Sequence, residues 1–229
     1  EACLVALDLE TTVAAPPCTN EYVHGMWKRH PQRIIQCWGA VEPAKGEIAM
    51  IQARKAIKEL GFIGFHFHPI MQHFAVSDRR YYPLFEEINV MGAAVMVDVG
   101  TTGMGPGMAG GNGALVRHAH PEHIDQLAAD FPNLKIIMAH PGWPWVDETT
   151  AVALHKGNVY WEMSGWAPKH FPGNLKVDIR GRLQDKIMFG SDYPSLPYER
   201  ILREWDELGY KPEVMEKIMH GNAEHLLGL

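Results

Sequence analysis

Lys186-Ile187-Met188-Phe189-Gly190-Ser191-Asp192-Tyr193-Pro194 closes a repeating pattern of strands and helices, and that pattern sets the fold class. The first four residues form an apolar, strand-like run, and the Gly-Ser-Asp that follows places the Asp192 carboxylate where the strand ends. In a barrel of parallel strands the C-terminal strand ends form the active-site face, so an aspartate there indicates chemistry. An Asx turn after the strand explains Asp192 equally well.

The same alternation extends back along the chain. Apolar runs alternate with amphipathic segments, which predicts parallel βαβ units, and the nearly continuous apolar character of the runs predicts a sheet covered on both faces. We expect strands over residues 3–7, 34–41, 62–67, 93–99, 134–139, 158–163 and 187–189. We expect helices over residues 20–30, 45–60, 81–90, 120–131, 148–155, 175–183, 198–208, 213–220 and 223–229.

Seven strands are one short of a closed (β/α)8 barrel. The chain begins at Glu1 and runs almost directly into a strand, so we expect a TIM barrel that lacks its first strand, with residues 1–229 as one domain. A length of 229 residues suits one barrel domain. An open doubly wound sheet is the alternative, but no GxGxxG follows the first strand to support it.

Composition excludes several classes of partner. A net charge of −6 without a run rich in Lys or Arg argues against nucleic acid and anionic membranes. No apolar run approaches the roughly 20 residues of a membrane span. The three cysteines are odd in number and lack CxxC spacing, which disfavours disulfide scaffolds and zinc ribbons and favours a cytoplasmic protein with reduced thiols.

Three residues at predicted strand ends are candidates for a metal site. Asp98 lies inside an apolar strand, where a carboxylate is costly unless it is paired, as in a salt bridge, or coordinates a metal. His140 follows the strand over 134–139, where imidazole serves as a metal ligand, as an acid or base, or as a hydrogen-bonded residue before Pro141. With Asp192, these side chains form a typical donor set for a divalent ion. We therefore expect residues 98, 140 and 192 to meet at one opening.

Further polar and aromatic residues surround this predicted mouth. His66 and His68 alternate with phenylalanines, so both imidazoles lie on one face of their strand, either as metal ligands or as pocket walls. Trp143, Trp166 and His170 follow strands and suit a planar, aromatic or unsaturated substrate, although a hydrophobic cap over the barrel is the alternative.

The glycine-rich segment Gly100–Gly113 lacks the Lys-Ser/Thr of a P-loop, so phosphate binding is weakly supported. A mobile loop that closes over the strand ends is the better interpretation.

Five motifs occur in order along nearly the whole chain: Gly61–Pro69, Ala139–Trp145, Ser164–Pro168, Gly190–Pro194 and Asn222–Gly228. Together they resemble the amidohydrolase-related family of metal-dependent TIM-barrel enzymes. Within it, the chain resembles the branch that contains aminocarboxymuconate-semialdehyde decarboxylase, resorcylate-type decarboxylases and ring-cleavage hydrolases and hydratases.

The resemblance implies roles for individual residues. Asp192 would be the last-strand metal ligand and general base, and His140 would orient or deprotonate metal-bound water or protonate the substrate. The chain departs from the family at three places. It has no first strand with a His-x-His or Glu-x-His pair, Asp98 stands where a ligand His is usual, and His66 stands where many relatives have Lys. Asp98 would shift the preference toward Mn or Mg.

The resulting prediction is a metal-dependent hydrolase that acts on a small carboxylated, aromatic-derived substrate. Asp192 and His140 are the predicted catalytic residues, and the predicted cofactor is a divalent ion, Zn first and Mn or Mg as alternatives. Two alternatives remain: a non-oxidative decarboxylase on the same metal site, and a metal-free degenerate barrel that serves as a binding protein. The expected partner is a small molecule, and a homo-oligomer is expected because relatives often form one.

Overall fold

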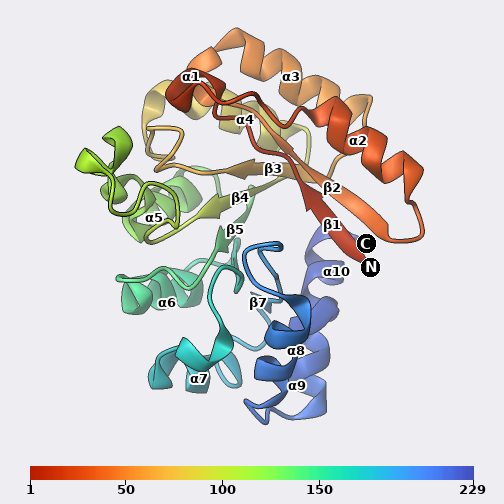
Figure 1. The fold of residues 1–229 in the computed structure, drawn as a ribbon, viewed down its shortest axis with the longest axis vertical. Helices are drawn as coiled ribbons and strands as arrows, with labels where there is room; N and C mark the ends of the chain where they lie inside the picture. Colours follow the sequence, from red (N-terminus) through yellow and green to blue (C-terminus); the bar gives the residue numbers. More distant parts are fainter.

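The computed structural model describes all 229 residues and contains one parallel sheet of seven strands, in which the strand order follows the chain from β1 to β7 (Figure 1). This sequential order excludes the doubly wound alternative, in which the order reverses. The sheet curls, and β1 and β7 are its two edges. The strands are β1 (Ala2–Val5), β2 (Ile34–Ala40), β3 (Gly64–Phe67), β4 (Ala94–Asp98), β5 (Lys135–Ala139), β6 (Val159–Glu162) and β7 (Ile187–Met188).

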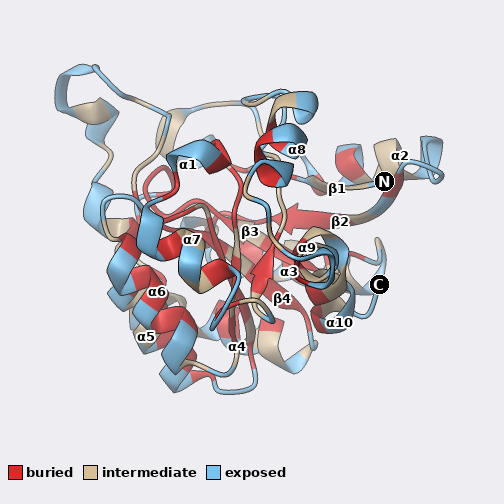
Figure 2. Cartoon of the chain, turned by 90° about the horizontal axis from the view of Figure 1, so that it is seen from below, coloured by how far each residue is buried: buried red, intermediate tan, exposed pale blue.

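Helices pack on the outer face of the curled sheet, and Figure 2 shows their buried sides turned inward and their exposed sides outward. None of them combines the length and apolar composition of a membrane span. The α-helices are α1 (Glu10–Val13), α2 (Asn20–Arg29), α3 (Glu47–Lys58), α4 (Tyr82–Val90), α5 (Pro121–Asp130), α6 (Val146–His155), α7 (Gly173–Ile179), α8 (Tyr198–Asp206), α9 (Pro212–Glu216) and α10 (Asn222–Leu227). Short 3-10 turns are η1 (Pro43–Lys45), η2 (Arg79–Tyr81), η3 (Ala109–Gly113), η4 (Val116–Ala119) and η5 (Pro168–His170), and η6 (Lys217–Gly221) is a π-helical turn.

Alternation along the strands sorts the apolar side chains into two clusters. In β4, Val95 and Val97 belong to the large core between sheet and helices. Ala94 and Met96 belong instead to a smaller cluster on the inner face, together with Leu226 of α10. Side chains at positions two apart share a face, so Asp98 lies on the inner face with Met96. The inner face at the C-terminal strand ends therefore carries the polar residues.

The main differences from the sequence prediction lie in the helices. All seven strands are present, but α6 begins at Val146 rather than 148, and α7 ends at Ile179 because the chain turns through Gly181. The expected helix over 213–220 divides into α9 and the π turn η6. Helix α1 lies in a segment for which we expected neither a strand nor a helix. These segments are short, and tertiary packing rather than propensity decides where such helices start and stop.

Candidate functional site

Asp98, the last residue of β4, is the centre of a cluster of polar side chains. Its carboxylate accepts a hydrogen bond of 2.8 Å from His66 Nε2, and His68 Nε2 lies 3.5 Å from the other carboxylate oxygen. His140 Nε2 lies 3.6 Å from the oxygen that His66 contacts. We call these four residues the Asp98 cluster. They come from β3, from β4 and from positions just after β3 and β5, so the C-terminal edge of the parallel sheet brings them together.

The Asp98 cluster is held together by charge. Burial on its own would raise the pKa of Asp98, but the three imidazoles outweigh it and hold that pKa well below its usual range. Burial also opposes a charge on His140, yet attraction by Asp98, aided by Glu162 and Asp192, raises the pKa of His140 to about 10. Burial dominates at His68 and lowers its pKa. At neutral pH the cluster therefore holds a carboxylate, a protonated His140 and a neutral His68.

His140 reaches Asp98 through an unusual backbone conformation. Strand β5 ends at Ala139, and His140 adopts a left-handed φ of 72°. If the strand continued, His140 would lie on the outer face with Met138, which belongs to the large core. The left-handed turn directs the imidazole to the inner face instead. The indole N–H of Trp161 donates a 2.7 Å hydrogen bond to the carbonyl oxygen of His140 and stabilises this turn.

Glu162 and Ser164 also belong to the site, and the sequence analysis did not assign them a role. Ser164 Oγ donates to Glu162 Oε2 at 2.7 Å and lies 3.1 Å from Nδ1 of His140. Glu162 Oε1 is buried without a hydrogen-bond partner, and burial raises the pKa of Glu162 to about 7. Glu162 is the last residue of the apolar strand β6, just as Asp98 is the last residue of β4. The signal that identified Asp98, a carboxylate in an apolar strand, therefore applies to Glu162 as well.

The raised pKa of Glu162 predicts a pH-dependent stability. The folded protein binds the Glu162 proton more tightly than the unfolded chain does. The free energy of unfolding therefore falls as the pH rises from 4.5, the ordinary pKa of the group, to about 7, its pKa in the folded protein. We expect the free energy of unfolding of the wild type to fall by about 3 kcal/mol relative to Glu162→Gln across this interval. Urea unfolding of the metal-free proteins at both ends of the interval measures the difference. Equal pH dependence in both proteins would contradict the prediction, and Glu86→Gln, at an exposed position, is the control.

Asp192 lies beyond the end of β7, beside the Asp98 cluster. It is exposed and left-handed, with φ 51°. Its charge contributes to the raised pKa of both His140 and Glu162, which places it near them. No hydrogen bond or ion pair joins its side chain to the cluster. The structure thus brings Asp98 and His140 into contact and Asp192 close to them, while the roles of all three stay predictions.

The predicted substrate-binding residues divide into two groups. His66 and His68 lie inside the Asp98 cluster, and His68 Nε2 also lies 3.1 Å from Oγ1 of Thr102, in the glycine-rich segment. The rings of Trp143 and Trp166 lie 6.1 Å apart, with Trp143 52% exposed. His170 is exposed in η5 and makes no hydrogen bond or ion pair with the cluster.

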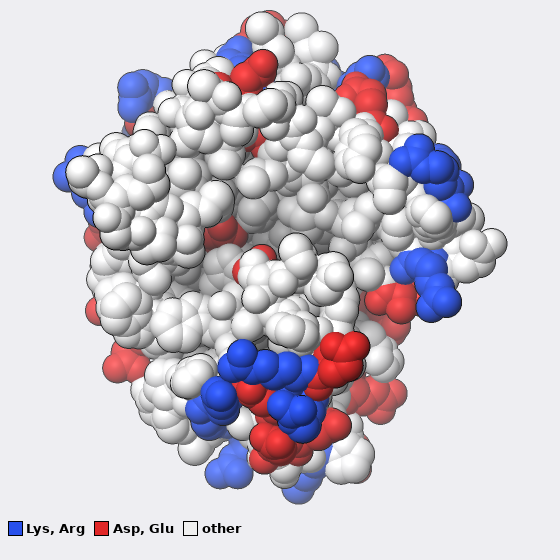
Figure 3. Space-filling view, in the orientation of Figure 1, with Lys and Arg blue, Asp and Glu red and all other residues white.

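Charged side chains are distributed unevenly over the face of the molecule that is drawn in Figure 3. Figure 3 shows a hollow near the centre of the face, with Asp and Glu atoms at its walls and Lys and Arg atoms at the periphery. No Lys or Arg side chain forms an ion pair with Asp98, Glu162 or Asp192. Positive charge at the Asp98 cluster therefore comes from imidazole alone.

The types of donor in the cluster suit a divalent metal, but their arrangement does not complete a site. Carboxylates and imidazoles are usual ligands of Mn and Zn, and the unpartnered Glu162 Oε1 is a further free oxygen donor. The imidazoles turn toward Asp98, however, and no three His, Cys, Asp or Glu side chains are arranged to hold one ion. The residues of this chain thus offer donors to a metal without forming a complete ligand set as they stand.

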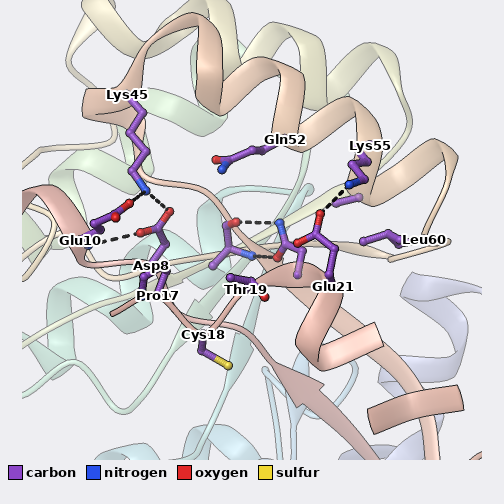
Figure 4. A pocket seen from close by; sticks show the side chains of 13 residues that line it. Asp8, Glu10, Pro17, Cys18, Thr19, Glu21, Lys45, Gln52, Lys55 and Leu60 are labelled. Carbon is purple, nitrogen blue, oxygen red and sulfur yellow. Dashed lines mark hydrogen bonds and ion pairs between the residues drawn. The ribbon is translucent and has the colours of Figure 1, made fainter. Parts of the chain in front are cut away.

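A second polar pocket, with a cavity of about 80 Å³, lies between the start of α2 and α3 (Figure 4). It shares no residue with the Asp98 cluster. Lys45 pairs with Asp8 at 2.7 Å and with Glu10 at 2.8 Å, and Lys55 pairs with Glu21 at 2.7 Å. Because the opposing charges already pair with each other, we interpret this pocket as a structural anchor for the segments that line it.

Gln72 connects this region to the Asp98 cluster. The buried amide nitrogen donates to the carbonyl oxygens of Asp8 and Val41, both at 3.1 Å, and the amide oxygen accepts from the backbone N–H of His68 at 3.0 Å. One side chain thus joins the segments that follow β1, β2 and β3.

Comparison with known proteins identifies the family. A family model described as amidohydrolase matches residues 5–229. An uncharacterised TIM-barrel protein from Bordetella bronchiseptica superposes with a TM-score of 0.85 at 30% identity, and the match covers 99% of this chain and 76% of that one.

Two decarboxylases share the fold at lower identity. The 2,6-dihydroxybenzoate decarboxylase from Rhizobium has a TM-score of 0.71 at 15% identity, with 96% of this chain and 77% of that chain covered. A dihydroxybenzoic acid decarboxylase from Polaromonas sp. JS666, with bound manganese and the inhibitor 2-nitroresorcinol, has a TM-score of 0.69 at 20% identity, with 96% and 76% covered. Both show the likeness of fold.

Proposed function

Because the chain belongs to the amidohydrolase family, we propose that it is a non-oxidative decarboxylase of a small hydroxylated aromatic carboxylate. The observation that carries this proposal is the Asp98 cluster, in which His140 Nε2 lies 3.6 Å from the Asp98 carboxylate at the C-terminal strand ends of a fold that two decarboxylases share. The expectation of an amidohydrolase-type barrel enzyme is confirmed. Hydrolysis, which the sequence analysis put first, has no comparable support, so its decarboxylase alternative is the better one.

His140 is suited to the proton transfer that this reaction needs. We propose that its Nε2 delivers a proton to the ring carbon that bears the carboxylate. The bond between that carbon and the carboxylate then breaks, CO2 leaves, and the bonding electron pair restores the aromatic ring. His140 becomes neutral and regains a proton from solvent. Asp98 favours the protonated state of His140 between turnovers, and general acid catalysis of this kind contributes about 10²–10⁴ in rate.

The negative charge of the substrate needs a positive partner. No Lys or Arg side chain pairs with the acidic residues of the site, so none is placed there to supply that positive charge. His140 provides one positive charge, and a bound divalent ion would supply more by polarising substrate oxygens as a Lewis acid. We propose Asp98 and Asp192 as the residues that would hold the ion; His140, which the sequence analysis also placed in the donor set, cannot coordinate it through Nε2 while that atom carries the proton that it donates. Manganese is a better proposal than zinc, because carboxylate donors suit it and because the Polaromonas neighbour contains it. Trp143 and Trp166 would then contact the substrate ring.

The proposal is tested by measuring CO2 release from 2,6-dihydroxybenzoate, the substrate in the name of the Rhizobium neighbour, in the presence of Mn²⁺. We expect decarboxylation that chelation abolishes and added Mn²⁺ restores. Metal analysis of the same samples addresses the metal-free alternative. Absence of CO2 from a panel of hydroxybenzoates with Mn²⁺ or Zn²⁺ present would overturn the proposal.

A further inference from the structure

We propose that Ser164 and Glu162 are positioning residues that hold the His140 imidazole at Nδ1 and so aim its Nε2 toward the substrate. This inference rests on the proposed function, because it assigns the proton-transfer role to Nε2. No hydrogen bond joins either residue to Asp98, whereas Ser164 lies within hydrogen-bonding distance of the imidazole.

The hydrogen-bond directions follow from the donors available. Glu162 Oε2 accepts the hydroxyl proton of Ser164 at 2.7 Å, so the Ser164 oxygen is left to accept a proton from His140 Nδ1 at 3.1 Å. Hydrogen bonds therefore run from His140 Nδ1–H to the Ser164 hydroxyl and from that hydroxyl to the Glu162 carboxyl, and we call this chain the relay. It keeps a proton on Nδ1 when Nε2 gives its proton away. Nε2 is thereby reserved for Asp98 and the substrate.

Two glycines show that the surrounding backbone is shaped around this relay. A Cβ at Gly165 would lie 2.5 Å from His140 Nδ1. A Cβ at Gly190 would collide with Glu162 Oε1. The His140 imidazole therefore occupies the space that a side chain at Gly165 would need, and the Glu162 carboxyl occupies the space that a side chain at Gly190 would need.

Burial supports a positioning role over a surface hydrogen bond. Ser164 is 7% exposed, and the Glu162 oxygen that does not face Ser164 is buried and unpartnered. Placing a carboxyl in such surroundings is costly unless it has a function. Partners one step removed from a reacting group typically contribute about 10–100-fold to activity.

Four substitutions separate the relay from general packing. Ser164→Ala removes the bridging hydroxyl. Gly190→Ala displaces Glu162 and also brings a Cβ to 3.0 Å from Ser164 Cβ, while no imidazole atom is among its nearest neighbours. Glu162→Gln keeps an acceptor for Ser164, whereas Glu162→Ala removes it. Gly157→Ala is the matched control, because a Cβ there meets nothing within 4 Å. We expect Ser164→Ala and Gly190→Ala to lower kcat by about 10–100-fold with little change in KM. Glu162→Gln should lose less of kcat than Glu162→Ala.

Proton NMR of the metal-free protein provides a readout that does not depend on turnover. The Nδ1–H resonance of the His140 imidazole, assigned by its loss in His140→Asn and distinguished from Nε2–H by 15N labelling of the ring, is expected in the wild type, Gly157→Ala and Glu162→Gln and absent in Ser164→Ala. Persistence of that resonance in Ser164→Ala, or a wild-type kcat for that variant, would overturn the relay. If the wild type decarboxylates nothing, the proposed function fails, and the NMR comparison alone decides the relay.

Discussion

His140→Asn is expected to lower kcat for decarboxylation by about 10²–10⁴, the usual contribution of a general acid. The reason is that the Asn side chain has no acidic proton to transfer at neutral pH, whereas attraction by the Asp98 carboxylate keeps His140 protonated in spite of its burial. Asn is the informative replacement because position 140 is left-handed, a conformation that Asn tolerates better than most residues. The measurement is steady-state CO2 release at saturating substrate and Mn²⁺.

The control for this substitution is His73→Asn. His73 is also left-handed, with φ 54°, but it is exposed and outside the Asp98 cluster, so we expect wild-type activity from it. Metal analysis of His140→Asn distinguishes its two predicted roles. Retained metal with lost activity indicates a proton donor, and lost metal indicates a ligand. A rate near that of the wild type would show that His140 has neither role.

Asp192→Asn should lower kcat by about 100-fold or more. Asp192 is exposed at the mouth, and its charge acts on both His140 and Glu162, so its carboxylate is placed to serve as base or metal ligand. Since the residue is exposed and Asn accepts its left-handed backbone, the substitution removes charge with little effect on folding.

Circular dichroism and CO2 release together check the Asp192 prediction. Asp206→Asn, an exposed change on α8, should leave both unchanged. If Asp192→Asn folds normally and keeps its rate of CO2 release, Asp192 takes no part in catalysis, and its predicted role as base or metal ligand is wrong.

The sequence predicted the parts of the site that local periodicity determines. Asp98 was identifiable because a carboxylate in an apolar strand must have a partner, and the shared face of His66 and His68 follows from strand alternation alone. The positions of all seven strands followed from the same alternation of apolar runs and helices. In these cases the physical cause acts within a few residues, so a single sequence contains it.

Other parts depend on contacts between distant segments. If β5 continued, strand alternation would place the His140 side chain on the outer face of the sheet. The left-handed backbone of His140, stabilised by Trp161, turns the side chain to the inner face. The link from His140 to Glu162 passes through Ser164 and needs the space left by Gly190, and neither spacing nor composition reveals such a link. Glu162 ends an apolar strand as Asp98 does, so the same rule applies to it.

The three hydrogen bonds of Gln72 have a consequence for how substrate reaches the barrel. These hydrogen bonds join the segments after β1, β2 and β3 to one buried amide, so we expect this part of the barrel entrance to be rigid. Residues 101–113, which follow the neighbouring strand β4, are by contrast largely exposed and rich in glycine. We therefore expect small molecules to enter and leave by movement of residues 101–113, while the imidazoles of the Asp98 cluster keep their positions.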